Sequence, residues 1–246
     1  MSTYSCPSLG AVLLTFISVS LLCGQSNTSN SAAPQAPGSA PDFSGVWTRR
    51  GGTDTRYMIY GFSGDELPMT PWALDRYRAN KPSFGPRMDT NDPTYDCYLP
   101  GIPRIYVHPA AFEFIHTPGR VIQYFEYDGF VRQIWTDGRP HLKIEDSGEL
   151  LWMGDSIGHW EGDTLVVDTT NFNDKTWLDR AGHPHSDELH LTERIRRVDR
   201  NSLQIDMTIE DPKAYTKPIK ALMNYQLRPD WHILEQACTD FPRPTP

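Results

Sequence analysis

The segment 191–210 constrains the fold most, because its side chains alternate between apolar and polar on both sides of one turn. The apolar positions after the turn are Leu203, Ile205, Met207 and Ile209. A period of two is typical of a β-strand with one buried face. A three-residue loop at 199–201 places Leu191 and Ile195 opposite apolar partners. This register predicts an antiparallel hairpin and places Glu193 on its apolar face.

Two hairpins are predicted further upstream. The first joins the strands AFEFIH and RVIQYFEY across a TPG turn, and the second turns at Asp128 and Gly129 into FVRQIWT. A two-residue Asp-Gly loop places Phe125 opposite Arg132 on one face. The other face holds Ile122, Tyr124, Glu126, Val131 and Trp135. Neither face is polar, which suits a barrel wall rather than a sheet with one wet face.

The strand count predicts the fold class. Residues 215–227 and 231–238 are expected to form a final hairpin, and the stretch 43–49 a first strand. The one predicted helix covers 67–81, with Thr70 as its N-cap and a proline at its first position. About nine or ten strands in a meander against one helix indicate an all-β, antiparallel, lipocalin-like barrel.

The N-terminal region differs in composition from the rest of the chain. The run LGAVLLTFISVSLL at 9–22 has the length of a signal-peptide core, and residues 25–41 have the composition of a disordered linker. We therefore expect a signal peptide at 1–24, a linker at 25–41 and a single barrel domain at 42–246. The protein is expected to be exported, periplasmic or secreted, with no transmembrane segment in the mature chain. A lipid anchor at Cys23 is the less favoured alternative.

The charge of the chain bears on its partners. The formal net charge is −8. An acidic chain without a long basic cluster does not suit a phosphate backbone, so we expect no nucleic-acid partner.

Cys97 and Cys238 are the two cysteines outside the N-terminal region. In an oxidising compartment two cysteines indicate one disulfide. Metal ligation or a reactive thiol is the alternative, and neither cysteine has a second cysteine or histidine at ligand spacing.

The stretch GHWEGDTLVVDT predicts a hairpin with Glu161 and Gly162 as its loop. In this register Asp155 lies opposite Asp168, and His159 shares their face. Opposed carboxylates repel unless a cation, a histidine or a shared proton lies between them. The alternative is that Asp155 belongs to a turn and that both carboxylates are solvated.

Glu193 is the strongest catalytic candidate. A carboxylate in an apolar setting either has a raised pKa, as a general acid or base requires, or pairs with a buried arginine. Arg132 and Arg197 are the expected partners. A purely structural ion pair that closes the barrel is an equal alternative.

The loop GHPHSDELH provides the candidate metal ligands. His183 and His185 can present two imidazoles to one ion, with Asp187 as a third ligand. His190 is expected to face Glu210 on the outside of the sheet. A solvated polar loop is the alternative. Neither Gly-x-Ser-x-Gly nor His-Glu-x-x-His occurs, which disfavours common serine hydrolases and metalloproteases.

Three motifs carry a family resemblance. GDSIGHWEGDTLVVDTTNF, HSDELHLTERIRR and IEDPKAYTKP are similar to motifs of a large family of secreted bacterial proteins. The resemblance covers most of 42–240 and implies an exported single domain, but no particular reaction. The triplet Gly45, Val46 and Trp47 separately resembles the start of lipocalin-type barrels. That likeness implies a tryptophan that plugs one barrel end and a small apolar ligand inside.

These observations lead to a functional hypothesis. We expect a cofactor-independent lyase, isomerase or hydrolase that acts on a small aromatic or terpenoid-like molecule inside the barrel. The candidate catalytic residues are Glu193, His159, Arg132, Tyr124, Asp155 and Asp168. The candidate ligand contacts are Trp135, Trp160, Phe125 and Met207. A carrier for a small apolar ligand is the alternative, and an envelope interaction protein with a filled barrel is a third reading. Inward polar groups favour the enzyme, because a carrier of apolar ligands gains little from burying carboxylates.

Overall fold

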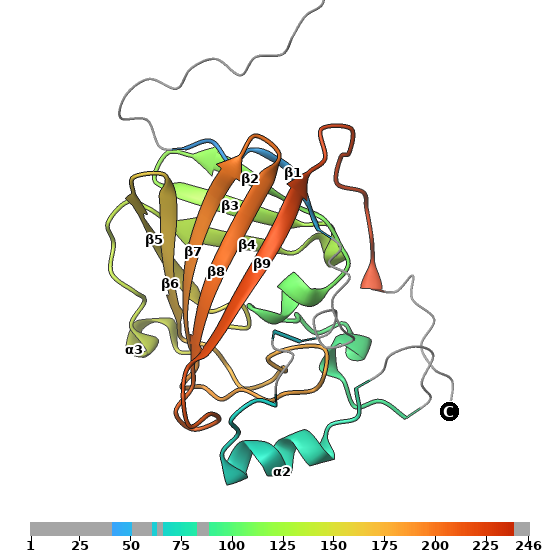
Figure 1. The fold of residues 1–246 in the computed structure, drawn as a ribbon. Coiled ribbons are helices and arrows are strands. Elements are labelled where there is room, and N and C mark those ends of the chain that lie inside the picture. The colour runs from blue at the N-terminus through green and yellow to red at the C-terminus, as the bar shows by residue number, and fades with distance from the viewer. Residues whose placement is uncertain (1–40, 51–60, 63–65, 83–88, 239–246) are drawn as a thin grey trace, which may run out of the picture. The chain divides into compact units, whose positions relative to one another are not determined.

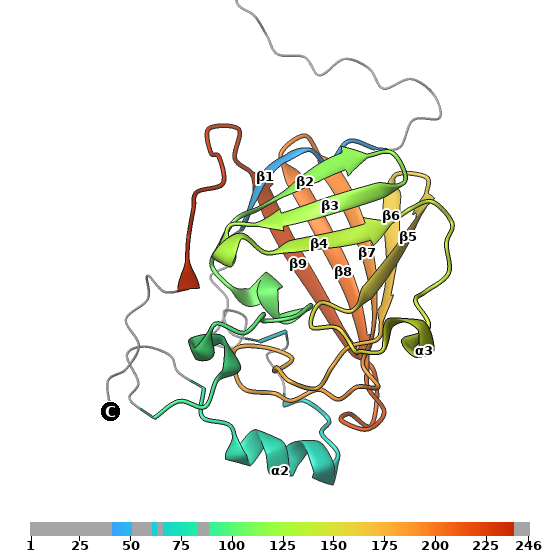
Figure 2. The ribbon, with the colours of Figure 1, turned by 180° about the vertical axis from the view of Figure 1, so that it is seen from behind.

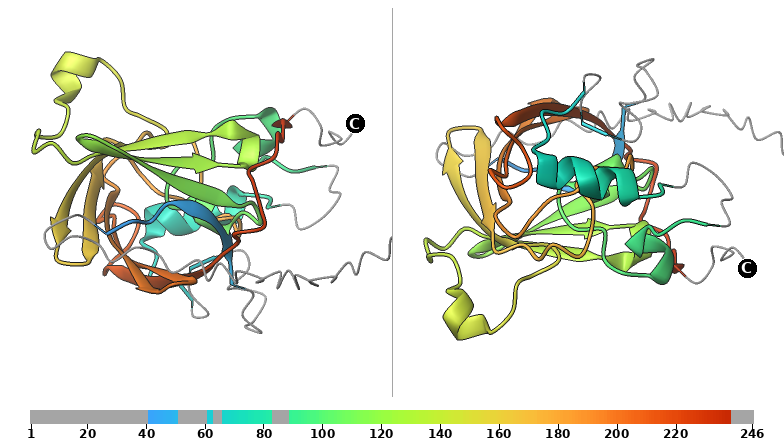
Figure 3. Two further views of the ribbon diagram at one scale, coloured as in Figure 1. Left: turned by 90° about the horizontal axis from the view of Figure 1, so that it is seen from above. Right: turned by 90° about the horizontal axis from the view of Figure 1, so that it is seen from below.

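Nine strands close into one barrel in the order in which they follow along the chain, which confirms the predicted all-β barrel (Figures 1 and 3). The computed structural model describes residues 41–50, 61–62, 66–82 and 89–238, all within the unit Pro37–Pro246. The strands are β1 (Gly45–Arg49), β2 (Phe112–Thr117), β3 (Arg120–Phe125), β4 (Val131–Trp135), β5 (Asp155–Glu161), β6 (Thr164–Thr170), β7 (His190–Asp199), β8 (Ser202–Glu210) and β9 (Ile219–Leu227). The predicted signal peptide, Cys23 and almost all of the linker lie outside the described residues.

The barrel closes between its first and last strands. β9 pairs with β1 through Trp47 opposite Leu227 and Arg49 opposite Tyr225. This pairing occupies the second edge of β9, since its first edge already pairs with β8. The predicted hairpin between 215–227 and 231–238 is therefore wrong, and residues 231–238 carry no strand.

One of the strand pairings is parallel, between β4 and β5. A parallel pair requires a long crossover connection. Here the crossover is formed by residues 136–154 and contains α3 (Ile144–Ser147), a single turn (Figure 2). Gly158 of β5 lies at this seam, where an added Cβ would approach Ile134 of β4 to 2.8 Å. This crossover also carries His141, which contacts Asp155 and Asp168 on the outer face of the barrel.

The register of β7 and β8 is the predicted one. Ile195 lies opposite Ile205 and Glu193 opposite Met207. The strands β8 and β9 continue the same pattern, so that the inward positions of all three strands are buried. The predicted inward direction of Glu193 is therefore confirmed.

Two other registers differ from the prediction by two residues. Arg132 lies opposite Gln123 instead of Phe125, because residues 127–129 form a 3₁₀ turn, η3 (Tyr127–Gly129), in place of a two-residue loop. The next hairpin turns at 162–163, so that Asp168 lies opposite Ile157 and not opposite Asp155. A slip of two residues preserves the face of each side chain. The predicted faces thus hold although the predicted partners do not.

One end of the barrel is covered by helix α2 (Pro71–Ala79) and by the long loops (Figure 3, right). Thr70 caps α2 by accepting a hydrogen bond from the Ala73 amide, as predicted. The loop before β2 holds two 3₁₀ turns, η1 (Pro93–Asp96) and η2 (Arg104–Val107). All four residues of η2 are buried.

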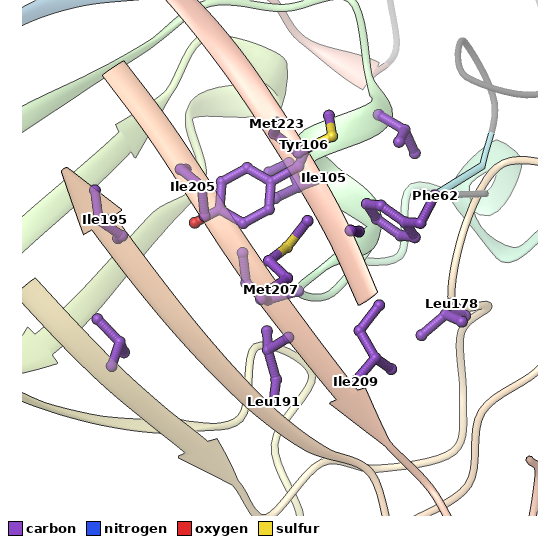
Figure 4. Close-up of a cluster of buried hydrophobic side chains, with 14 of the residues drawn as sticks. Phe62, Ile105, Tyr106, Leu178, Leu191, Ile195, Ile205, Met207, Ile209 and Met223 are labelled. Carbon is purple, nitrogen blue, oxygen red and sulfur yellow. The ribbon is translucent and has the colours of Figure 1, made fainter. Parts of the chain in front are cut away.

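The core lies inside the barrel and is filled partly by a residue that belongs to no strand. Tyr106 of η2 lies among the side chains of Ile205, Met207 and Met223 from β8 and β9 (Figure 4). Trp47 is fully buried and donates its indole N–H to the Phe43 carbonyl at 2.9 Å. No helix within the described residues is long and apolar enough to cross a membrane.

Candidate functional site

An ion pair between Arg132 and Glu193 crosses the barrel interior from β4 to β7. Arg132 donates to both carboxylate oxygens of Glu193, with Nη1 at 3.1 Å from Oε1 and Nη2 bonded to Oε2. Side-chain exposure is 1% for Arg132 and 0% for Glu193. The prediction that Glu193 pairs with Arg132 is confirmed. Arg197 is not a partner, since it is half-buried at the other end of β7 and donates to the carbonyls of Asp42 and Arg200.

Tyr106 completes this ion pair from the side of η2. Its hydroxyl donates to Glu193 Oε1 at 2.8 Å and accepts from Arg132 Nη1 at 3.0 Å. Burial, and next the charge of Glu193, raise the pKa of Tyr106 well above its ordinary value. The phenol therefore stays protonated and acts as a hydrogen-bond donor.

The remaining donors of Arg132 are also used inside the barrel. Nε donates to the Ser156 hydroxyl at 3.0 Å and Nη2 to the Thr169 hydroxyl at 2.9 Å. The amide oxygen of Gln123 accepts from Arg132 Nη1 at 3.4 Å and lies 3.1 Å from the Tyr106 hydroxyl oxygen. We call Arg132, Glu193, Tyr106, Gln123, Ser156 and Thr169 the interior cluster. All polar atoms of the Arg132 and Glu193 side chains have hydrogen-bond partners. The interior cluster therefore fits a structural ion pair better than a catalytic group, and it links the strands from β3 to β7.

A second chain of charged groups lies on the outer face of β5 to β8. His141 lies between two carboxylates, with Nδ1 at 2.9 Å from Asp155 and Nε2 at 2.8 Å from Asp168. His190 contacts the other oxygen of Asp168, with Nε2 at 2.5 Å from Oδ1. We call Asp155, His141, Asp168 and His190 the outer relay. It runs from a buried carboxylate, Asp155, to an imidazole whose side chain is 40% exposed, His190.

Each group of the outer relay comes from a different position in the fold. Asp155 begins β5, Asp168 lies on β6 and His190 begins β7. His141 comes from the β4–β5 crossover, which is held by two hydrogen bonds: the Leu142 amide donates to Asp155 at 2.8 Å, and Asn171 donates to the Leu142 carbonyl. The parallel crossover thus places a histidine between carboxylates of two neighbouring strands.

The partners of the outer relay decide where its protons lie. An ionised carboxylate only accepts hydrogen bonds, so Nε2 of His190 is the donor where it contacts ionised Asp168. Its Nδ1 lies 3.8 Å from Glu210, too far for a hydrogen bond. In neutral His190 with its proton on Nε2, Nδ1 therefore carries a lone pair that can accept a proton, on the side of the ring near Glu210.

The electrostatic setting of Asp168 fits this role. Burial raises the pKa of Asp168, but the hydrogen bonds from His190 and His141 outweigh burial and hold it below its ordinary value. Asp168 is thus an ionised carboxylate that orients two imidazoles. A carboxylate that orients a histidine is the usual support of a general base.

The sequence predicted part of the outer relay. Asp155 and Asp168 share a face, and a histidine lies between them, as their repulsion requires. The predicted histidine was His159, which is wrong: His159 is 65% exposed and lies 3.2 Å from Glu161. His141 was missed because no local pattern links it to β5: the demand for a partner between the carboxylates called for a histidine but did not identify this one.

Other predicted site residues lie apart from both clusters. Tyr124 and Trp135 lie on the outer face of the barrel, where the Trp135 ring packs under Arg139 at 3.6 Å. Neither can line the interior. Phe125 and Met207 are buried on the inner face, and Trp160 is partly buried against Phe43 at 5.3 Å. These three residues serve the core.

The loop histidines do not converge. His183 bonds to Asp179 at 2.7 Å and stacks on Tyr77, while His185 is buried and bonds to the Ser186 carbonyl. Asp187 pairs with Lys213 at 2.9 Å. Among the described residues, no group of three or more His, Cys, Asp or Glu side chains is arranged to hold a metal ion. The candidate metal ligands of this loop therefore do not form a site in the described part of the chain.

Cys97 and Cys238 form the predicted disulfide. It joins the end of η1 to the segment that follows β9, and the Cys238 amide donates to Asp128 at 2.8 Å. The disulfide thus fixes the C-terminal segment beside the loop that carries η2. Comparison with known proteins adds no assignment: no protein-family model matches the sequence, and no curated protein matches it.

Proposed function

We propose that the protein is an exported enzyme that performs cofactor-independent acid/base chemistry on a small molecule at the outer relay. The observation that carries this proposal is the chain of contacts from Asp155 through His141 and Asp168 to His190. General bases are recognised by such an arrangement, in which an accessible histidine is oriented by a carboxylate that is itself held in place. The proposal moves the chemistry away from Glu193, whose oxygens are occupied.

The proposed step is a proton transfer at His190. Nδ1 takes a proton from a carbon acid or from an attacking water, and the imidazolium that forms donates through Nε2 to ionised Asp168. His141 holds Asp168 from the other side, and the buried carboxylate of Asp155 holds His141. In the second half of the reaction, His190 returns the proton to the leaving group or to a neighbouring carbon. This sequence fits a lyase, an isomerase or a hydrolase.

The surroundings of the outer relay support an apolar substrate. Leu142 and Ile144 follow His141 in the crossover and are 48% and 46% exposed. Exposed apolar side chains next to a polar group offer contact area to an aromatic or terpenoid-like molecule. The disulfide supports export, because disulfides persist in oxidising compartments.

The proposal is tested by a screen for turnover. Residues 42–246 are incubated with small phenolics, terpenoids and esters, and the products are followed by mass spectrometry. His190→Gln keeps a hydrogen-bond donor for Asp168 but removes the base, and we expect turnover to fall by about 100-fold or more. His159→Gln is the matched control, since His159 is also an exposed outer-face histidine beside a carboxylate.

The outcomes separate clearly. Turnover by the wild type and by His159→Gln, with loss in His190→Gln, supports the proposal. Equal turnover in all three proteins contradicts it, and so does the absence of turnover of every compound class by the wild type.

A further inference from the structure

The segment before β1 lies at the barrel end where the β5–β6 and β7–β8 hairpins turn, beside Trp160 and Arg197. The Phe43 side chain is fully buried, and its ring lies 5.7 Å from Phe114 of β2 and 5.3 Å from Trp160 of β5. Ser44 pairs with Phe114 in an isolated bridge. Phe43 thus packs between β2 and β5 at this end of the barrel.

A histidine holds the main chain of this segment. The Phe43 amide donates to His116 Nε2 of β2 at 3.0 Å, so this nitrogen is the acceptor and carries no proton. The His116 ring stacks on Trp160, with ring centroids 6.2 Å apart and an angle of 21° between the ring planes. His116 is only partly buried, and it can therefore exchange protons with the solvent.

Protonation of His116 removes this acceptor. Both nitrogens of an imidazolium are donors, so a rotation of the ring cannot restore the hydrogen bond. The Phe43 N–H then loses its partner, and a buried polar group without a partner costs about 1–3 kcal/mol. The hydrogen bond therefore exists only while His116 is neutral.

The surroundings of His116 favour its neutral form at pH 7. Burial lowers the pKa of His116 below its ordinary value, although the charge of Asp42 raises it. Asp42 belongs to the segment before β1, and its carbonyl accepts from Arg197 of β7 at 2.9 Å. β5 contributes the uncharged ring of Trp160, and β3 places the apolar Val121 opposite His116. A histidine with a lowered folded pKa stabilises the fold above about pH 6.5, and this contribution is lost as the pH falls through the folded value.

We infer that His116 is an acid-sensitive latch, which holds residues 42–44 in the barrel end while it is neutral and releases them when it is protonated. Release uncovers the Phe43 ring and the face of Trp160 that packs against it, so this barrel end presents more apolar surface in acid. Histidine is the usual group in such switches, because its charge changes between about pH 5 and 8. The latch is separate from the outer relay and does not depend on the proposed function.

The latch is tested by amide hydrogen exchange of the full chain, measured by NMR at about pH 7.5 and about pH 5, on either side of the ordinary histidine pKa. Each rate is divided by the intrinsic exchange rate at that pH. We expect the protection of the Phe43 amide to fall by at least about tenfold at the lower pH, while the amides of β7 and β8 stay protected. His116→Gln has no titrating group, so its Phe43 protection should be the same at both pH values. His159→Gln, at an exposed histidine of β5, should respond to acid as the wild type does.

The nitrogen chemical shifts of the His116 ring give a second measurement that needs no variant. At the higher pH we expect a proton on Nδ1 and none on Nε2, and a protonated Nε2 overturns the inference. Equal protection of Phe43 at the two pH values in the wild type also overturns it, as does an acid-induced loss in His116→Gln as large as that of the wild type. A simultaneous loss of protection in β7 and β8 overturns it too, because acid would then unfold the whole barrel and not release one segment.

Discussion

The interior cluster and the outer relay both hold carboxylates with nitrogen-bearing side chains from other elements of the fold, in two different environments. Inside the barrel, Glu193 and Arg132 are almost fully buried and their polar atoms all have partners. On the outer face, His190 is 40% exposed and its Nδ1 is beyond hydrogen-bonding distance of Glu210. A buried carboxylate whose hydrogen bonds are all made, such as Glu193, is suited to stabilise the fold. A half-exposed histidine with one nitrogen that makes no hydrogen bond, such as His190, is suited to transfer protons.

The energetics of the two regions differ in the same sense. Removal of one partner from a buried ion pair leaves an uncompensated charge and is strongly destabilising. Ion pairs at half-exposed positions contribute little to folding, because solvent screens them. Substitutions in the interior cluster should therefore change the free energy of unfolding, and substitutions in the outer relay should change turnover.

The largest expected effect is that of Arg132→Met. It leaves Glu193 buried without its cation, and we expect the free energy of unfolding to fall by about 3–5 kcal/mol. Urea unfolding followed by tryptophan fluorescence measures it. The double variant Arg132→Met/Glu193→Leu removes both charges and should recover much of the loss. Arg196→Met, at an exposed arginine of β7, is the control, and an equal loss in that variant would contradict the assignment.

The next effect concerns the outer relay. Asp168→Asn keeps the shape of the side chain but removes the charge that orients His141 and His190. We expect turnover to fall by about 100-fold, which corresponds to about 2.7 kcal/mol of activation free energy. Steady-state kinetics on a substrate from the screen measure the change. Asp137→Asn is the control, because Asp137 is also an acceptor for a cation, Arg139, on the outside of the barrel.

A smaller effect is expected from Tyr106→Phe. The variant removes the hydroxyl that donates to Glu193 and keeps the ring that fills the barrel. The lost hydrogen bond in a buried charged cluster should cost about 1–3 kcal/mol of unfolding free energy. Urea unfolding checks this value, and turnover in the folded variant should stay close to that of the wild type. A variant of full stability would show that Tyr106 does not support the interior cluster.

The smallest effect is a contribution of Asp168 to acid stability. Its pKa is lower in the folded protein than in the unfolded chain, so it stabilises the fold at neutral pH. This contribution is lost as the pH falls below about 3.9 and through the lower folded pKa. The wild type should therefore lose its advantage over Asp168→Asn in thermal melts as the pH is lowered through this range. A difference that persists at lower pH would contradict the expected sign.

The sequence predicted the fold and the direction of Glu193 better than the outer relay. The long alternation on both sides of 199–201 allows a single register that matches every apolar residue, and this register is the observed one. The hairpins at 127–129 and 162–163 have shorter patterns, and local turn geometry shifts each register by two residues. Such a shift leaves the faces unchanged, which explains why the faces of Asp155 and Asp168 were predicted correctly.

The position of His141 had no signal of its own in the sequence. His141 reaches Asp155 and Asp168 only because β4 and β5 are parallel and the crossover between them returns along the barrel wall. The same crossover was not predicted, since an antiparallel meander requires none. Similarly, the position of Tyr106 inside the barrel depends on η2, which has no hydrophobic period to reveal it.

The most direct test of the central claim compares Glu193→Gln and His190→Gln in one assay of turnover and one of urea unfolding. We predict that His190→Gln loses about 100-fold in kcat/KM and changes the unfolding free energy by less than about 1 kcal/mol. Glu193→Gln should lose several kcal/mol of stability but keep kcat/KM within about threefold of the wild type while it is folded. A folded Glu193→Gln protein without turnover, together with a fully active His190→Gln protein, would contradict the account.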